Sequence, residues 1–112
     1  GDGGIYSSVA DLYRWDQGLY TDKLVSRKML QLAFSPGSVT DLPHTNYGFG
    51  WYLSEYRGMR EIWHRGSSVG FTTRLVRFPE RKFTVIILAN RDEAKIAEFA
   101  HRIADWYLFG EQ

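Results

Sequence analysis

Apolar residues recur at two different spacings along this chain, and the spacing changes near residue 47. Before that point, Leu12, Trp15 and Leu19 lie three or four residues apart, which places them on one face of a helix. Charged and amide side chains occupy most of the positions between them. The pattern therefore predicts that residues 5–35 are helical, with these three side chains on a shared apolar face.

Start and stop signals divide this region into two helices. Ser8 is followed three residues later by Asp11, as in a capping box, where the hydroxyl accepts a hydrogen bond from a free amide of the first turn. Ser26 is a second N-cap signal, and Pro36-Gly37 ends the helix that follows it. Residues 35–46 contain two prolines and are predicted to form a polar loop.

From residue 47 onward, the spacing is that of β-strands. Arg57-Gly58 and Pro79-Glu80-Arg81 are turn signals between apolar segments. The last of these segments is apolar almost throughout, as in a central strand that is covered on both faces. The four predicted strands are residues 47–56, 60–66, 71–78 and 82–90.

A last helix is predicted over residues 92–110, with Asn90 or Asp92 as its N-cap and Gly110 at its end. Its apolar stripe consists of Ile96, Phe99, Ala100, Ile103, Ala104 and Tyr107. The predicted fold class is therefore α+β: a four-stranded antiparallel meander sheet over residues 47–90, preceded by two helices and packed by a C-terminal helix.

Composition narrows the functional classes. The chain has 112 residues, of which 14 are basic and 13 acidic, for a net charge of +1. A dedicated nucleic-acid binder normally carries a clear basic excess. The chain has no cysteine, which excludes disulfides and thiolate metal sites, and no apolar stretch long enough to span a bilayer. We expect neither a nucleic-acid partner nor a membrane segment.

The first residues, Gly1-Asp2-Gly3-Gly4, resemble a turn in the interior of a protein, without an initiator methionine. We therefore expect residues 1–112 to be a single segment of a larger domain. An anion-binding role for these glycines is disfavoured, because no lysine follows them at the spacing of a P-loop.

Gly66-Ser67-Ser68-Val69-Gly70 matches G-x-S-x-G, the nucleophile elbow of α/β-hydrolases. That elbow requires a sharp turn from a strand into a helix, whereas residues 71–78 alternate like a strand. We therefore prefer a bulge of small residues between two strands.

The histidines and arginines suggest two further kinds of site. His44, His64 and His101 lack the spacing of metal ligands, and His101 lies beside Arg102 on the last predicted helix, where solvent exposure is expected. We therefore predict no metal and no cofactor. Arginines along the sheet, together with aromatic residues, could form a platform for single-stranded nucleic acid or sugar, but acidic residues interrupt the series.

Five short motifs follow one another along the sheet region: Tyr-Gly-x-Gly-Trp, His-x-Gly, Gly-Phe, Phe-Pro-Glu-Arg and Val-Ile-Ile-Leu-Ala-Asn-Arg. Gly3-Gly4 and Ala10-Asp11-Leu12 add a helix-entry motif before them. The ordered set resembles the C-terminal part of the serine β-lactamase and penicillin-binding-protein family, especially class C β-lactamases and related esterases and D,D-peptidases. The resemblance covers essentially the whole chain.

The resemblance implies a role for one strand. In that family, S-x-x-K, a Tyr-x-Asn or Ser-x-Asn motif, and K-T-G on an edge strand meet in one cleft. His64-Arg65-Gly66 matches the third motif. By this resemblance His64 contacts the substrate carboxylate or the proton network, Gly66 leaves room for the acyl group, and the backbone N–H of Ser67 is one oxyanion-hole donor. Arg65 is assigned to substrate binding.

The sequence also departs from the family's pattern. No S-x-x-K and no Tyr-x-Asn occurs in it, and His64 and Arg65 replace the usual lysine and hydroxyl residue. The resemblance therefore implies an intact parent that forms an acyl-enzyme on an upstream serine and hydrolyses an ester, peptide or β-lactam, with this segment inactive alone. The replacements favour an esterase or peptidase over a lactamase. The alternative is a non-catalytic binding or interaction module. We also expect uncovered apolar surface to make the segment self-associate.

Overall fold

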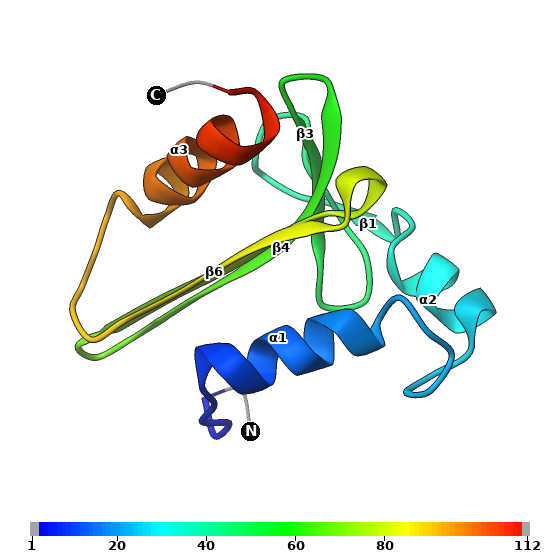
Figure 1. Cartoon of the computed structure of the whole chain (residues 1–112), viewed down its shortest axis with the longest axis horizontal. Helices are drawn as coiled ribbons and strands as arrows, with labels where there is room; N and C mark the ends of the chain where they lie inside the picture. Colours follow the sequence, from blue (N-terminus) through cyan, green and yellow to red (C-terminus); the bar gives the residue numbers. More distant parts are fainter. Residues whose placement is uncertain (1–2, 111–112) are drawn as a thin grey trace.

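The computed structural model describes residues 3–110, and an antiparallel sheet of six strands forms the centre of this part of the chain (Figure 1). Gly1 and Asp2, half of the expected first turn, lie outside the described residues. The strands pair in chain order. They are β1 (Ser38–Val39), β2 (Asn46–Tyr47), β3 (Tyr52–Tyr56), β4 (Met59–Ser68), β5 (Phe71–Phe78) and β6 (Phe83–Ala89).

Three helices accompany the sheet in the described residues, together with a short 3₁₀ turn, η1 (Pro79–Arg81). Two precede the sheet, α1 (Val9–Gly18) and α2 (Arg27–Ala33), and α3 (Ile96–Leu108) follows it. The α+β class, the meander order and the C-terminal helix are thus confirmed. The helical region 5–35 is interrupted over residues 19–26, between α1 and α2.

The prediction of four strands is wrong, because the described sheet has six. The two additional strands, β1 and β2, lie wholly or partly in the segment 35–46 that was expected to be a loop. Each has only two residues, so neither can display the alternation that identifies a strand in a sequence. β3 also begins at Tyr52, later than predicted, because Gly48 donates its backbone N–H to the carbonyl of Trp51 in a turn.

Both predicted serine caps are confirmed. The hydroxyl of Ser8 accepts a hydrogen bond from the backbone N–H of Asp11 at 3.2 Å, and Ser26 does the same for Met29 at 3.2 Å. The expected apolar face of α1 is confirmed in part, because Leu19 at its C-cap is buried and Leu12 is half-buried. Within the helix itself the buried residue is Asp16, whereas Trp15 stacks on Trp51 and remains 43% exposed.

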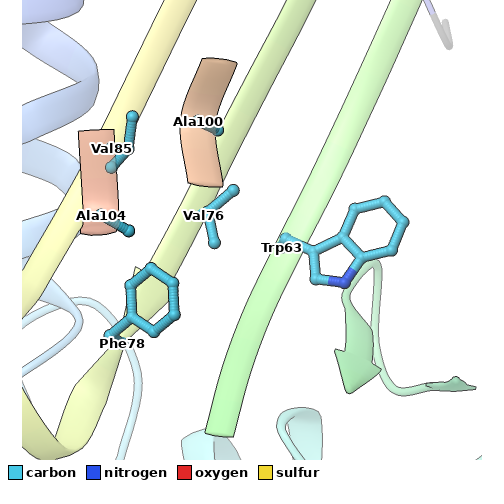
Figure 2. Close-up of a cluster of buried hydrophobic side chains, with 6 residues drawn as sticks. All are labelled: Trp63, Val76, Phe78, Val85, Ala100 and Ala104. Atoms are coloured by element: carbon cyan, nitrogen blue, oxygen red, sulfur yellow. The ribbon is translucent and has the colours of Figure 1, made fainter. Parts of the chain in front are cut away.

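The helices lie on opposite faces of the sheet, with α1 below and α3 above in Figure 1. The face toward α3 holds the larger apolar cluster, in which Ala100 and Ala104 of α3 lie against strand side chains (Figure 2). Small residues at these two positions allow the helix to approach the sheet closely. Burying each large side chain contributes about 1.5–3 kcal/mol. The strand members are Trp63, Val76, Phe78 and Val85.

A smaller cluster lies on the other face and consists of Leu19, Leu30, Trp51, Leu53 and Ile62. Leu30 belongs to α2, so this cluster joins the first helical region to β3 and β4. The two clusters together give the sheet an apolar layer on each side.

β6 was expected to be a central strand covered on both faces. The coverage is confirmed, because α1 and α3 both contact it, from opposite sides. Its position is not central: β6 is the outermost strand of the described sheet, after β5. An apolar strand sequence indicates that both faces of the strand are covered. It does not indicate which strands lie beside it in the sheet.

The last helix begins later than predicted. Its N-cap is Lys95, without a side-chain cap, so neither Asn90 nor Asp92 serves that role. Gly110 follows the helix with φ of +68°, a left-handed conformation that suits glycine at a helix end. The expected apolar stripe is too wide, because Phe99 is 41% and Tyr107 72% exposed.

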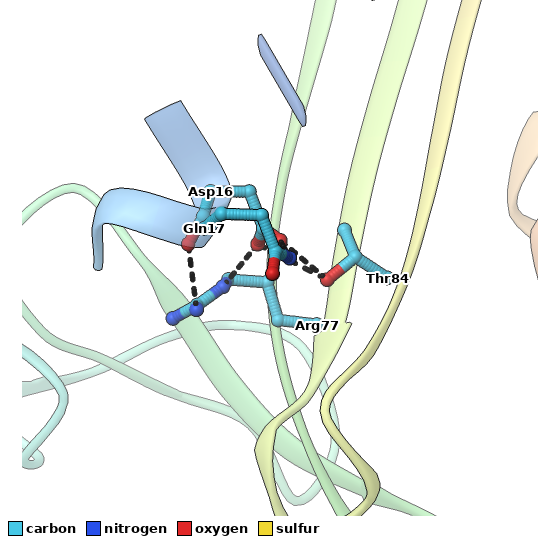
Figure 3. A network of polar contacts seen from close by, with 4 residues as sticks. All are labelled: Asp16, Gln17, Arg77 and Thr84. Carbon is cyan, nitrogen blue, oxygen red and sulfur yellow. Dashed lines mark hydrogen bonds and ion pairs between the residues drawn. The ribbon is translucent and has the colours of Figure 1, made fainter. Parts of the chain in front are cut away.

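A buried ion pair fixes α1 to the sheet (Figure 3). Arg77 of β5 donates from Nε to Asp16 Oδ1 at 2.6 Å, and both side chains are at most 1% exposed. The hydroxyl of Thr84 donates to the same carboxylate at 3.0 Å, as does the amide of Gln17. Hydrogen bonds therefore offset much of the cost of burying the two charges.

Candidate functional site

β4 carries all four residues that the sequence assigned to the site. β3 pairs with β4 only as far as Tyr52 opposite Trp63. From residue 64 to residue 68, β4 pairs with β5 alone. Among the described residues, the outer edge of this stretch therefore has no strand partner. Such an edge can bind an extended ligand through its backbone N–H and C=O groups.

Side chains along this stretch alternate between the two faces of the sheet. By this alternation His64 and Gly66 belong to the face of Ile62, whereas Arg65 and Ser67 belong to the face of Trp63 and α3. At the open edge, however, the rings of His64 and Tyr52 are 5.4 Å apart, and the Arg65 guanidinium lies 5.9 Å from the same Tyr52 ring. Tyr52 itself stacks on Trp63, so His64 and Arg65 meet at this edge.

His64 is exposed and lies beside two tyrosines. Its Nε2 is 3.1 Å from the hydroxyl of Tyr47, and its ring centre is 5.4 Å from that of Tyr52. The tautomer of the imidazole decides which of the two partners donates. Tyr47 is the first residue of the Tyr-Gly-x-Gly-Trp motif, but the sequence alone gave it no role in the site. This hydrogen bond makes it a neighbour of His64 across 17 residues.

Gly66 is required by its neighbour on β5. A Cβ atom added at Gly66 would lie 2.6 Å from Oγ1 of Thr73, its cross-strand partner. That distance is far below an ordinary van der Waals contact. The absence of a side chain at Gly66 therefore has a packing cause within the protein.

Neither Ser67 nor Ser68 has the surroundings of a nucleophile. Both are exposed, and no hydrogen bond among the described residues joins a serine hydroxyl to a histidine or lysine. Val69 and Gly70 link β4 to β5 in a two-residue hairpin turn, with Gly70 at φ of +78°. The G-x-S-x-G match is thus a strand–turn–strand, as expected, with a tight turn in place of the predicted bulge.

Arg65 faces another arginine. Arg74 lies directly opposite it on β5 and is buried, at 6% exposure. The guanidinium of Arg74 rests on the ring of Trp63 at 3.9 Å, while its Nε has no hydrogen-bond partner. Burial lowers the pKa of Arg74 from its ordinary value, with the charge of Glu61 opposing this and that of Arg65 adding to it.

His101 was expected to face solvent, and this is wrong. Its side chain is 25% exposed and its Nε2 lies 2.8 Å from Oε2 of the buried Glu61. Its ring stacks on Tyr56 at 3.7 Å between centroids. The periodicity of the last helix could not predict this contact, because Glu61 lies 40 residues away from His101, on a strand. The pair joins α3 to β4, away from His64.

Asp105 extends the same contact between α3 and the β3–β4 hairpin. Tyr56 donates its hydroxyl to the carboxylate at 2.9 Å, and Arg57 donates at 3.0 Å. Partial desolvation favours a higher pKa for Asp105, but the hydrogen bonds from Tyr56 and Arg57 and the charge of Arg57 outweigh it. The pKa of Asp105 is therefore lowered from its ordinary value.

Residues 3–110 lack two other kinds of feature. This part of the chain has no group of three histidine, aspartate or glutamate side chains placed to hold a metal ion. It also has no helix long and apolar enough to cross a membrane.

Comparisons with known proteins agree with one another. A family model described as Beta-lactamase matches residues 1–105. Penicillin-binding protein 4* of Bacillus subtilis (strain 168) is 37% identical over 114 residues, which cover 99% of this chain and 25% of that protein. The crystal structure of a penicillin binding protein from Bacillus halodurans aligns with a TM-score of 0.79 at 20% identity, over 92% of this chain and 32% of that one. The chain thus spans about a quarter of the length of the curated relative.

Proposed function

The chain belongs to the serine β-lactamase and penicillin-binding-protein family, and on that basis we propose that it forms part of a serine hydrolase. In this proposal residues 64–67 of β4 form one wall of the active site, and the nucleophilic serine lies in a part of the protein beyond these 112 residues. The observation that carries the proposal is the open edge of β4 at the His-x-Gly motif. Esters, peptides and β-lactams are the candidate substrates, as small molecules or peptides.

Each residue of this wall has a proposed role. The acyl part of the substrate lies along the open edge, beside Gly66, where no side chain interferes. The backbone N–H of Ser67 donates to the oxyanion of the tetrahedral intermediate, a role that needs a fixed amide and not a hydroxyl. His64 contacts the substrate carboxylate or passes a proton, and Tyr47 orients its imidazole through the 3.1 Å contact. Arg65 contacts an anionic part of the substrate.

The role of the Ser67 amide can be tested in the intact protein with two substitutions at one position. Ser67→Ala keeps the N–H, so we expect kcat/KM to stay near that of the wild type. Ser67→Pro removes the N–H, so we expect a loss of about 10²–10³-fold, as for other oxyanion-hole donors. Circular dichroism checks that both variants are folded. An equal loss in the two variants would assign the effect to the hydroxyl and contradict the proposal.

The 112-residue chain by itself supplies the second test. We expect no covalent label with a fluorescent penicillin and no turnover of a p-nitrophenyl ester, because a positioned nucleophile and its base are both needed. The intact protein is the positive control. A covalent adduct on Ser67 or Ser68 would place the nucleophile within this chain and overturn the proposal.

A non-catalytic binding module is the second candidate function. It is favoured by the lack of any serine hydroxyl bonded to a histidine or lysine in residues 3–110. The two candidates differ in one feature of the longer protein: an S-x-x-K motif ahead of this chain favours the hydrolase, and its absence favours the binding module.

A further inference from the structure

A pocket with a volume of about 360 Å³ lies beside α2, on the face of the sheet that carries the smaller apolar cluster. Its lining comes from three regions that are far apart in the sequence: the segment after α1, α2 with its C-cap, and β4. Sites for small molecules in proteins have volumes of about 300–1,000 Å³. None of residues 64–67 lines this pocket, and its residue from β4, Arg60, lies about 13 Å before His64 along the strand. The pocket is therefore separate from the proposed wall of the active site.

The floor of the pocket is apolar. Leu19 and Leu30 are buried, at 9% and 8% exposure, and both belong to the smaller cluster. Phe34 is half-buried, and its ring meets that of Trp51 edge to face, with 5.7 Å between the centroids. The ring of Tyr20 forms a further part of the lining. The apolar part of a ligand would be withdrawn from water on this floor, which favours binding.

Arg60 adds a positive charge and is fixed beside the pocket. Its Nη2 donates a hydrogen bond to the backbone carbonyl of Phe34, the C-cap of α2. A guanidinium has five N–H donors, so this bond leaves others for a ligand. Glu55 is the cross-strand partner of Arg60, but it does not line the pocket, and no ion pair joins the two in residues 3–110. The charge of Arg60 is thus available to a ligand.

Arg27 supplies a second positive charge, from the first residue of α2. The helix dipole disfavours a cation at this end of a helix, and the first turn of α2 has no acidic residue. Arg27 forms no ion pair within the described part of the chain. The described lining of the pocket therefore contains two arginines and no aspartate or glutamate.

An apolar floor beside two positive charges selects among ligands. A bare inorganic anion would make no use of the floor, and an uncharged apolar molecule would make no use of the arginines. A nucleic acid needs a more extended basic surface than two arginines provide. A small carboxylate with an apolar body uses both parts of the pocket.

We propose that this pocket binds a small amphipathic carboxylate. The apolar body of the ligand lies on Leu19, Leu30 and Phe34, and its carboxylate accepts hydrogen bonds from Arg60 and Arg27. Such charge-assisted bonds are shorter and stronger than those between neutral groups, and they orient the ligand. The site goes beyond the proposed hydrolase function, because it contains none of residues 64–67 and needs no nucleophile.

Binding is measured on the intact protein by NMR. The ¹³C-labelled methyl groups of Leu30 report on the pocket, and those of Val85, in the cluster on the opposite face of the sheet, are the control. Sodium hexanoate, sodium acetate and 1-hexanol are titrated separately at constant ionic strength. Acetate lacks the apolar body, and hexanol lacks the charge. We expect hexanoate to shift the Leu30 signals saturably and to bind at least about tenfold more tightly than either of the others, with Val85 unchanged.

Three variants test the two arginines. Arg60→Gln and Arg27→Gln should each weaken hexanoate binding about tenfold. Arg81→Gln, at an exposed arginine of η1 outside the pocket, should leave it unchanged. Arg27→Gln removes an unfavourable charge from the start of a helix, so this variant decides the matter if Arg60→Gln, which loses its bond to Phe34, does not fold.

Three results would each overturn the inference: no saturable shift with hexanoate, equal affinity for acetate or hexanol, or unchanged affinity in either folded arginine variant. Binding is read without turnover. An active hydrolase whose pocket does not respond would therefore overturn only this inference, and an inactive protein that binds hexanoate would leave it standing.

Discussion

Two arginines of β5 show how differently a sheet can accommodate a buried positive charge. Arg77 is paired with Asp16 and lies on the face toward α1, whereas Arg74 rests on Trp63 on the face toward α3. The first has hydrogen bonds to a carboxylate and a carbonyl, and the second has an Nε without a partner. The two positions therefore respond to substitution in different ways.

Removing the carboxylate at Asp16 should strongly destabilise the protein. Asp16→Asn leaves Arg77 charged and buried without its counter-ion, which costs about 3–5 kcal/mol in comparable cases. The free energy of unfolding is measured by urea denaturation. Replacing both partners, as Asp16→Leu with Arg77→Met, should restore a large part of the loss. A double variant as unstable as Asp16→Asn would show that the ion pair is not the cause.

Gly66→Ala should lower stability by about 1–3 kcal/mol, the usual cost of overpacking. The added methyl group meets Oγ1 of Thr73, so the second substitution Thr73→Ala should relieve the clash and return most of the stability. Thermal unfolding of the two variants measures this. Lack of rescue by Thr73→Ala would mean that Thr73 is not what excludes a side chain at Gly66.

The same pair of variants separates packing from catalysis in the intact protein. If Gly66 also leaves room for substrate, the double variant recovers its stability but not its kcat/KM. If packing is its whole role, both recover together. The second result would contradict the proposed role of Gly66 in the active site.

Among the elements, α3 is tied to the β3–β4 hairpin by polar contacts in addition to its alanine stripe. Glu61 meets His101, and Tyr56 and Arg57 meet Asp105. These contacts cross from a hairpin to the last helix, so acid should loosen the attachment of that helix first.

The pKa of Asp105 determines how this attachment should depend on pH. Its pKa is lowered in the folded protein, so its ionised form contributes stability at pH values above the ordinary carboxyl pKa of about 3.9. That contribution is lost as the pH falls from there through the lowered pKa. Melting temperatures of the wild type and of Asp105→Asn should therefore differ at neutral pH and converge in acid. Asp22→Asn, at an exposed position, is the control; a constant difference across this range would contradict the expectation.

At the scale of the whole molecule, large apolar side chains remain exposed on both helical layers of the described residues. Tyr13 of α1 is 54% exposed and Trp106 of α3 is 50% exposed, and Phe99 lies two turns before Trp106. β6 also offers an outer edge that is unpaired in this part of the chain. Exposed apolar patches and open strand edges both favour association.

We therefore expect the 112-residue chain, studied alone, to self-associate. Sedimentation velocity should show a species heavier than the monomer that dissociates on dilution. Trp106→Glu should shift the equilibrium toward monomer, while Glu98→Gln, an exposed polar position on the same helix, should not. A clean monomer at high concentration would contradict the expectation.

The sequence predicts those features of the fold that depend on near neighbours. The serine caps, the turn at Arg57-Gly58 and the hairpin after Phe78 each depend on a few adjacent residues, and the structure contains all of them. β1 and β2 are too short to leave a pattern. The Asp16–Arg77 pair joins residues 61 apart and depends on how α1 lies on the sheet, which no local pattern encodes.

The candidate site, too, could be predicted from the sequence only in part. The family resemblance predicts residues 64–67 as site residues, and that assignment stays a prediction. The comparisons confirm the family. The open edge of β4 follows from where β3 stops pairing, which a motif does not reveal. Likewise the partners Tyr47, Thr73 and Arg74 come from other strands.

The pairing of every strand with its neighbour in the chain has a consequence for the order of folding. Such contacts close short loops and form quickly, so the sheet can assemble before α1 reaches it. The contacts of Asp16 with β5 and β6 close loops of 61 and 68 residues and should form late. Asp16→Asn should then speed unfolding and leave the refolding rate almost unchanged. In this protein the most deeply buried charges would set the lifetime of the folded state without guiding the chain toward it.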